Sequence, residues 1–162
     1  MGEVLSRSEA AETAEALKQK GQMIVFTNGC FDIIHAGHVR MLEDAKKLGD
    51  VLFVGLNSDA SVKRIKDPSR PVFPEDERAE VLSALSPVDY VVIFEEDTPF
   101  EIISEVRPQI LTKGGDWDAD KIVGRDIVEA SGGKVVRIPY REGLSTSAII
   151  EKIKTGASNR SK

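Results

Sequence analysis

Five short, largely apolar runs alternate along the chain with longer helical patterns. Each run is bounded by turn residues and is too short for a helix, so the runs predict strands at Met23–Thr27, Val51–Asn57, Val88–Phe94, Gln109–Thr112 and Lys134–Ile138. Apolar strands separated by helices are typical of a parallel sheet that is covered on both faces. The sequence therefore predicts an α/β fold with a doubly wound parallel sheet of about five strands.

Helical patterns fill the intervals between these strands. Gly49 ends the first, Pro74 begins the second, and Thr98 to Glu101 matches a capping box with proline at the first helical position. We expect helices over residues 37–48, 75–85, 98–106, 119–131 and 147–154, after an N-terminal helix over residues 8–20.

Length and composition favour one globular domain. The chain has 162 residues, of which 41% are hydrophobic and 30% charged. We assign residues 1–22 to an N-terminal helical extension, residues 23–154 to the domain and residues 155–162 to a disordered tail. No apolar stretch approaches the roughly 18 residues of a membrane span, and the N-terminus lacks a signal pattern. We therefore expect a cytoplasmic protein without a membrane partner.

The charge balance argues against a nucleic-acid partner. The chain has 27 Asp and Glu against 22 Lys and Arg, a formal net charge of −5, so an anionic ligand needs a local basic cluster. Cys30 is the single cysteine, which excludes an internal disulfide and disfavours a structural zinc site. We expect Cys30 to pack as a small residue rather than act as a nucleophile.

Ligands of an open parallel sheet bind beyond the carboxyl ends of its strands. The segments that follow the first, second, fourth and fifth predicted strands are rich in groups that can bind phosphate. They read NGCFDIIHAGHV, SDASVKRIKDPSRP, KGGDW and YREGLSTS. We therefore expect the binding site at this edge of the sheet.

The chain's two histidines, His35 and His38, flank Gly37 where a helix is expected to begin. They are open to interpretation as a metal site, a proton-transfer pair, a helix cap or a phosphate clamp. Metal-binding histidines on a helix usually lie four residues apart with a third ligand nearby, which disfavours the metal site. Gly37 lets an anion approach the free N–H groups of the helix N-terminus, which favours the clamp. The segment has neither GxGxxG nor a P-loop pattern.

The segment TNGCFDIIHAGHVRMLEDAKKLGD resembles the opening of the nucleotidyltransferase superfamily with the HxGH signature, which includes the cytidylyltransferases and the class I aminoacyl-tRNA synthetases. The likeness continues through VGLNSDASVKRIK, RPVFPEDERAEVLSAL, VDYVVIFEEDTP, KGGDW and EGLSTSAIIEKI, and covers roughly residues 23–153. Within this superfamily the chain looks most like the adenylyltransferases of ADP-heptose synthesis, which act on D-glycero-β-D-manno-heptose 1-phosphate. The resemblance implies a Rossmann-like fold.

The resemblance implies in-line attack of a sugar-phosphate oxygen on the α-phosphorus of ATP, with Mg²⁺ present and pyrophosphate released, for lipopolysaccharide or surface-glycan synthesis. His35, His38 and Lys46 would be catalytic, and Arg78 and Lys113 would bind the substrate phosphate. No residue is expected to bind the metal. The nucleotide would be bound by Thr27, Asn28, Gly29, Cys30, Phe31, Gly37, Gly114, Asp116, Ser145, Thr146 and Ser147.

Several of these residues also have a purely structural interpretation. Lys46 can be a solvated helix lysine, and Arg78 can form an ion pair with Asp76 or Glu75 on its own helix. The hydroxyls around Thr146 can cap the last helix rather than hold phosphate.

Two other functions stay open: a cytidylyltransferase acting on glycerol 3-phosphate or a similar polyol phosphate, and a nucleotide-binding module without turnover. Ala36 stands where the cytidylyltransferases carry a bulky aromatic residue, which favours the heptose-type enzymes. Tyr140 stands where the cytidylyltransferases have an arginine, so Arg141 does not inherit that arginine's role.

The resemblance also bears on partners. It implies a homodimer, and in bifunctional heptose enzymes a sugar kinase precedes this domain. The segment before Met23 is far too short for a kinase. We therefore expect a separate heptose kinase upstream in the pathway.

Overall fold

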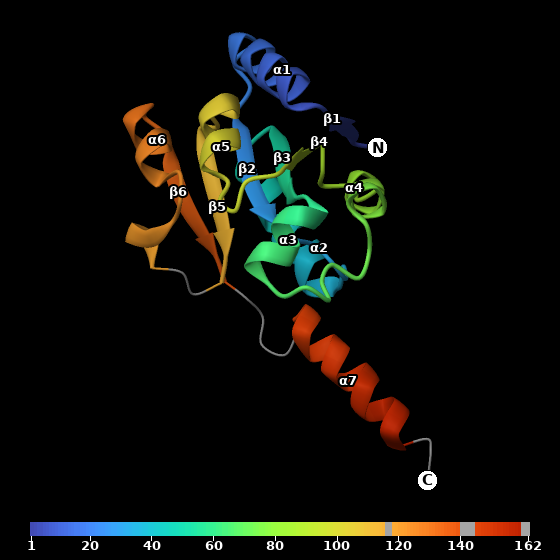
Figure 1. Ribbon diagram of the computed structural model, residues 1–162. Coiled ribbons are helices and arrows are strands. Elements are labelled where there is room, and N and C mark those ends of the chain that lie inside the picture. The colour runs from blue at the N-terminus through green and yellow to red at the C-terminus, as the bar shows by residue number, and fades with distance from the viewer. Residues whose placement is uncertain (116–117, 140–144, 160–162) are drawn as a thin grey trace.

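The computed structural model describes residues 1–115, 118–139 and 145–159. Within them, parallel strands form a six-stranded sheet in the order β1-β4-β3-β2-β5-β6, with helices on both faces (Figure 1). The predicted doubly wound α/β fold is confirmed. The strands are β1 (Glu3–Leu5), β2 (Ile24–Gly29), β3 (Val51–Asn57), β4 (Tyr90–Phe94), β5 (Ile110–Gly114) and β6 (Lys134–Ile138).

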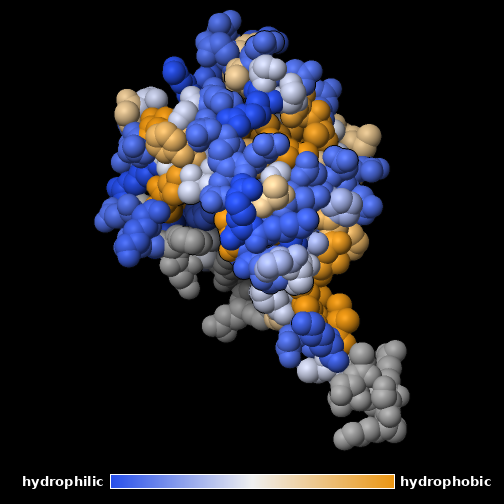
Figure 2. Space-filling view, viewed as in Figure 1, coloured by the Kyte–Doolittle hydropathy of each residue, from blue (hydrophilic) through white to orange (hydrophobic). Residues whose placement is uncertain are grey.

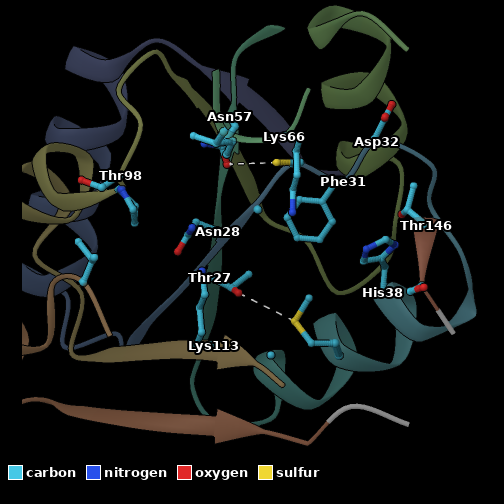
Figure 3. A pocket seen from close by; sticks show the side chains of 18 of the residues that line it. Thr27, Asn28, Phe31, Asp32, His38, Asn57, Lys66, Thr98, Lys113 and Thr146 are labelled. Carbon is cyan, nitrogen blue, oxygen red and sulfur yellow. Dashed lines mark hydrogen bonds between the residues drawn. The ribbon is translucent and has the colours of Figure 1, made fainter. Parts of the chain in front are cut away.

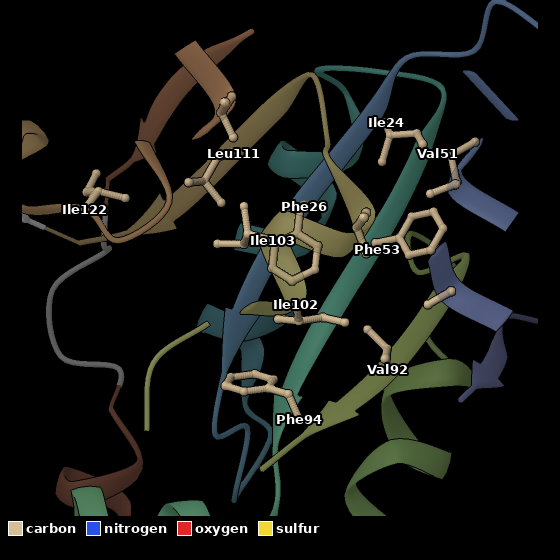
Figure 4. Close-up of a cluster of buried hydrophobic side chains, with 14 residues drawn as sticks. Ile24, Phe26, Val51, Phe53, Val92, Phe94, Ile102, Ile103, Leu111 and Ile122 are labelled. Carbon is tan, nitrogen blue, oxygen red and sulfur yellow. The ribbon is translucent and has the colours of Figure 1, made fainter. Parts of the chain in front are cut away.

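Two layers of helices bury the sheet. Helices α1, α5 and α6 cover one face around a core that includes Phe26 and Ile102 (Figure 4), and α2 and α4 cover the other around Val25 and Leu42. Because side chains alternate along a strand, the neighbours Val25 and Phe26 of β2 serve opposite layers. The helices are α1 (Arg7–Gln19), α2 (Ala36–Lys46), α3 (Asp59–Ile65), α4 (Glu75–Ser83), α5 (Phe100–Val106), the 3₁₀ turn η1 (Ala119–Lys121), α6 (Arg125–Ala130) and α7 (Thr146–Asn159).

The strand order reverses at β2. Strand β3 pairs with β2 on one side and β5 pairs with it on the other. The chain therefore crosses to the other side of β2 between β4 and β5, and the loops after β2 and β5 diverge. In open α/β sheets this switch point is where ligands bind.

The N-terminal segment is part of the packed domain rather than an extension of it. Strand β1, which was not predicted, pairs with β4 at one edge of the sheet, and the N–H of Gly2 donates to the carbonyl of Ser83 at 2.8 Å. Ala10 and Ala14 of α1 are completely buried. A three-residue strand is too short to show a hydrophobic period, which explains why the pattern missed it.

Two helix predictions need correction beyond small shifts at the ends. The helix predicted over residues 119–131 is interrupted at Gly124, whose φ of 90° lies in the left-handed region, so η1 and α6 are separate. Helix α5 begins after Pro99 with no side-chain capping bond, so the predicted capping box of Thr98 is wrong. Helix α3 follows β3 directly in a segment where no helix was predicted; its N-cap Ser58 accepts a hydrogen bond from the N–H of Ser61.

Helix α7 extends away from the body of the molecule (Figure 1), and in the face shown by Figure 2 apolar side chains gather where it leaves a mostly hydrophilic surface. The helix runs to Asn159, so the disordered tail predicted from residue 155 is wrong over residues 155–159. The Thr155 hydroxyl donates to the carbonyl of Glu151, one turn earlier, at 3.0 Å. Residues 160–162 lie outside the described residues. Among the helices that the structure describes, none has the length and apolar character needed to cross a membrane.

Candidate active site

A cavity of about 540 Å³ opens at the carboxyl edge of the sheet, at the switch point beside β2 (Figure 3). Its walls come from the ends of β2, β3 and β5, the segment after α3 and the start of α7. It brings together most of the predicted site residues: Thr27, Asn28, Gly29, Cys30, Phe31, His35, His38, Lys113, Gly114, Ser145, Thr146 and Ser147.

The two histidines form a stacked pair at the N-terminus of α2. His35 is the N-cap, and its Nδ1 accepts a hydrogen bond from the N–H of Gly37 at 3.1 Å. Nδ1 of His38 accepts from the N–H of His35 at 3.4 Å, and the ring centroids lie 3.9 Å apart. An imidazole whose Nδ1 accepts carries its proton on Nε2 when neutral. The helix-cap role therefore leaves one Nε2–H donor on each ring for a ligand.

Both histidines are neutral near pH 7 in the free protein. Burial, followed by the neighbouring His35, lowers the pKa of His38 to about 4. Burial also lowers the pKa of His35. Phe31 packs beside His38 with the ring centroids 5.3 Å apart and so contributes to that burial. The pair can donate hydrogen bonds to an oxyanion without carrying a charge of its own.

Basic side chains complete the cavity. Lys113, at the end of β5, lies on the opposite side from His38 in Figure 3, and burial lowers the pKa of its ammonium group. Lys66, Arg70 and Lys121 also line the cavity. In a chain with a net charge of −5, these side chains form the local basic cluster that an anionic ligand requires.

The hydroxyls at the start of α7 have mixed roles. Ser145 Oγ accepts from the N–H of Ala148 at 3.0 Å, which is a helix cap, and the Thr146 hydroxyl donates to the carbonyl of Ile33 at 3.3 Å. The second bond ties α7 to the loop that carries the histidines. Both residues and Ser147 line the cavity, so the cap interpretation does not exclude contact with a ligand.

Arg78 does not reach the cavity, and its predicted role in binding substrate phosphate is wrong. Its side chain is 1% exposed. Its guanidinium donates to the carbonyls of Cys30, Asn57 and Phe73 and forms an ion pair with Asp59 at 2.8 Å. Arg78 instead joins the loops after β2 and β3 to α4, because three inward-facing carbonyls need a donor there.

Lys46 also lies outside the cavity, which corrects its predicted catalytic role. Helix α2 runs from the carboxyl edge of the sheet back toward the other edge, so Lys46 ends roughly 15 Å along the helix from the histidines. There its ammonium group donates to the carbonyl of Asp50 at 2.6 Å and pairs with Asp89. A position on the same helix does not imply a position in the same site.

Four further residues of the sequence analysis have different positions. Gly37 donates its N–H to His35 and lies beside a small second cavity with Gly114 rather than in the main one. Asp116 and Arg141 lie outside the described residues. Cys30 lines the cavity, but burial raises the pKa of its thiol, which disfavours a nucleophile.

The described residues do not form a metal site. Among them no three His, Cys, Asp or Glu side chains are grouped to hold an ion. The carboxylates that line the cavity are Asp32 and Asp97, which are paired with Arg70 and Arg64. These residues do not fit a protein-bound Mg²⁺.

Sequence reasoning missed several residues of the cavity. Lys66 and Arg70 belong to the segment SDASVKRIKDPSRP, whose composition suits phosphate but whose pattern marks no single residue. Asn57 and Thr98 end or follow strands on the same edge. The signal available for all of them was position after a strand, which marks a whole segment rather than one side chain.

The fold and this cavity define an α/β protein of the HxGH nucleotidyltransferase class. Comparison with known families agrees: the cytidylyltransferase-like family model matches residues 26–152, and the chain belongs to that family.

Individual proteins of known sequence or structure are also similar to this chain. The chain is 56% identical over 151 residues to the "Bifunctional protein HldE" of Trichlorobacter lovleyi, and 52% identical over 147 residues to that of Syntrophotalea carbinolica. These matches cover 93% and 91% of this chain but 30% of each relative, so the chain spans less than a third of their length. A solved structure titled "lipopolysaccharide core biosynthesis protein", from Thermoplasma volcanium, is 32% identical with a TM-score of 0.65, over 75% of this chain and 100% of that one.

Proposed function

We propose that this domain transfers the adenylyl group of ATP to a sugar 1-phosphate, D-glycero-β-D-manno-heptose 1-phosphate, and thereby makes ADP-heptose and pyrophosphate for lipopolysaccharide synthesis. The observation that carries the proposal is the stacked His35–His38 pair, whose Nε2–H groups are left for a ligand in a cavity lined with lysine and arginine. The relatives named HldE and the lipopolysaccharide core protein support the choice of acceptor.

In this reaction an oxygen of the acceptor's phosphate attacks the α-phosphorus of ATP. The bond from that phosphorus to the bridging oxygen breaks, and pyrophosphate leaves with the electron pair. No covalent bond to the protein forms, so catalysis is positioning and stabilisation of negative charge. His35 and His38 donate from Nε2, and Lys113 supplies positive charge across the cavity. Magnesium enters with the triphosphate as part of the substrate.

The nucleotide lies along the ends of β2 and β5 in this proposal. Thr27, Asn28, Gly29 and Gly114 face it there, and Ser145 to Ser147 approach its phosphates from the start of α7. We further propose a homodimer in the cytoplasm, supplied by a heptose kinase activity.

The test is a screen for pyrophosphate release with ATP, CTP, GTP and UTP, each offered heptose 1-phosphate and glycerol 3-phosphate. ATP with heptose 1-phosphate is expected to be the best pair. A preference for CTP with glycerol 3-phosphate would instead establish a cytidylyltransferase. Nucleotide binding with no pyrophosphate from any pair would identify a binding module.

A further inference from the structure

One arginine of the cavity is held in a fixed orientation by a buried carboxylate. Arg70 Nε donates to Asp32 Oδ2 at 2.5 Å, and the two side chains are 12% and 1% exposed. The other oxygen of Asp32, Oδ1, accepts from the N–H groups of Val72 at 2.8 Å and Phe73 at 3.1 Å. Asp32 therefore has both oxygens occupied, and it clamps the segment around Arg70 to the loop after β2.

The rest of the Arg70 guanidinium is left for a ligand. Among the described residues, the side chain of Arg70 bonds only through Nε, to Asp32, so neither terminal nitrogen is bonded to protein there, and Arg70 is one of the residues that line the cavity. Arg78, eight positions along the chain, has its Nε and both terminal nitrogens bonded to protein. A planar fork with two free amino groups is the geometry that binds phosphate oxygens in pairs.

The position of Asp32 locates this fork in the cavity. Asp32 precedes His35 in the same loop, and Figure 3 shows Asp32, His38 and Thr146 on one side of the cavity, with Lys113 and Thr98 on the other. Arg70, bonded to Asp32, therefore belongs to the histidine side. In the proposed reaction that is the side of the triphosphate.

We propose that Arg70, oriented by Asp32, binds the β- and γ-phosphates of the nucleotide. This inference rests on the proposed function for the identity of the ligand. Asp32 is a positioning residue: it does not touch substrate, but it determines which edge of the guanidinium faces the cavity.

The experiment is calorimetric titration of ATP and AMP into the wild type, Arg70→Met and Arg125→Met. Because AMP lacks the two outer phosphates, Arg70→Met is expected to lower the affinity for ATP about 10- to 100-fold and to change the affinity for AMP less than about threefold. Arg125 is the matched control, since it is also paired with carboxylates, Asp120 and Glu129, but lies outside the cavity. Its variant should bind both nucleotides as the wild type does.

Arg70→Lys keeps a positive charge but lacks the planar fork, and it replaces the methionine variant if that variant does not fold. It should lower the affinity for ATP about 5- to 10-fold. Unchanged ATP binding in either variant, an equal loss for ATP and AMP, or a higher KM for the acceptor alone would overturn the assignment. Failure of the wild type to bind ATP would instead contradict the proposed function, so the two failures are distinguishable.

Asp32→Asn tests the positioning role. The amide oxygen can still accept from Val72 and Phe73, but its NH₂ group cannot accept from Arg70 Nε. The variant should bind ATP more weakly than the wild type and bind AMP equally well. The double variant Asp32→Asn, Arg70→Met should bind ATP no more weakly than Arg70→Met alone. Additive losses in the double variant would show that Asp32 acts on the fold and not through Arg70.

Discussion

Both ends of helix α2 carry polar side chains, but the two ends differ in the hydrogen-bonding groups that these side chains leave unused. At its N-terminus, His35 and His38 bond to the backbone through Nδ1 and keep Nε2 for a ligand. At its C-terminus, Lys46 donates to Asp50 and Asp89, and Asp89 also accepts from the N–H of Leu52. The histidine end therefore keeps donors that we propose bind the nucleotide, whereas the side chains at the lysine end bond to one another and to the backbone.

The same contrast separates Arg70 from Arg78. Both are largely buried and both contact a carboxylate. Arg78 has its remaining donors on backbone carbonyls, whereas Arg70 lines the cavity and, among the described residues, makes no side-chain hydrogen bond other than that to Asp32. Residue type and burial therefore do not distinguish the two arginines. They differ in the hydrogen-bonding capacity that is left unused, and this is why we propose Arg70 and not Arg78 as a ligand-binding group.

Arg78→Met gives the largest effect that this comparison predicts. It leaves three buried carbonyls without their donor and Asp59 without its partner, so the free energy of unfolding should fall by about 3–5 kcal/mol. Urea denaturation measures this, with Arg125→Met as a surface control expected to lose less than about 1 kcal/mol. Unchanged stability with a raised KM for a substrate would place Arg78 with the binding groups instead.

His38→Ala tests the open end of the helix. Removing one Nε2–H donor should lower kcat at least about 10²-fold with a smaller effect on KM, as expected for a contact that strengthens in the transition state. Steady-state pyrophosphate release measures both constants. Circular dichroism of the variant provides the control, because its fold should be intact. Equal losses in kcat/KM and in ATP affinity would show that His38 binds ATP without stabilising the transition state further.

Local pattern was enough to predict most of the sheet. The boundaries of β3 and β6 match the predicted runs residue for residue, because buried strands between turn residues leave a clear signal. Strand β1 and the break at Gly124 were missed. The first depends on pairing with β4, far along the chain, and the second on a left-handed φ, and neither leaves a periodic signal.

The site was predicted by segment better than by residue. The rule that ligands bind beyond the ends of strands located the segments that bring His35, His38 and Lys113 to the cavity. It could not separate Arg70 from Arg78, because their difference is which acceptors surround each guanidinium in three dimensions. Lys46 was misplaced because a helix carries its C-terminal residues away from the edge where its N-terminus lies.

Acid titration sharpens the picture of the histidine end. The folded protein keeps His38 unprotonated down to a pKa of about 4, whereas the unfolded chain takes up that proton near pH 6.5. Between pH 6.5 and pH 4 the unfolded state therefore binds more protons than the folded state. The free energy of unfolding should decrease as the pH is lowered through this window, and this histidine should have no such effect above it. His38→Asn lacks this histidine and should lose less stability on acidification. Because the ring is only partly buried, we expect its loss in the free energy of unfolding to be about 1–2 kcal/mol smaller than that of the wild type.

The measurement is the free energy of unfolding in urea at pH 7, 6, 5 and 4 for the wild type and His38→Asn. Taking the difference between the two proteins cancels the carboxylates, which titrate in both. His35→Asn is the companion variant, since burial lowers the pKa of His35 as well. A difference that stays constant from pH 7 to 4 would show that the pKa of His38 is unshifted by folding.

The smallest effect belongs to the closed end of the helix. Lys46 and Asp89 are 31% and 35% exposed, so Lys46→Met should cost only about 0.5–1 kcal/mol of unfolding free energy. Because Lys46 lies away from the cavity, kcat and KM should stay within about twofold of the wild type. Lys47→Met, at a neighbouring side chain that is 72% exposed, controls for loss of charge on this helix and should cost less. If Lys46→Met instead lowered kcat tenfold or more with stability unchanged, the lysine end would have to reach the substrate, and the distinction between the two ends of α2 would fail.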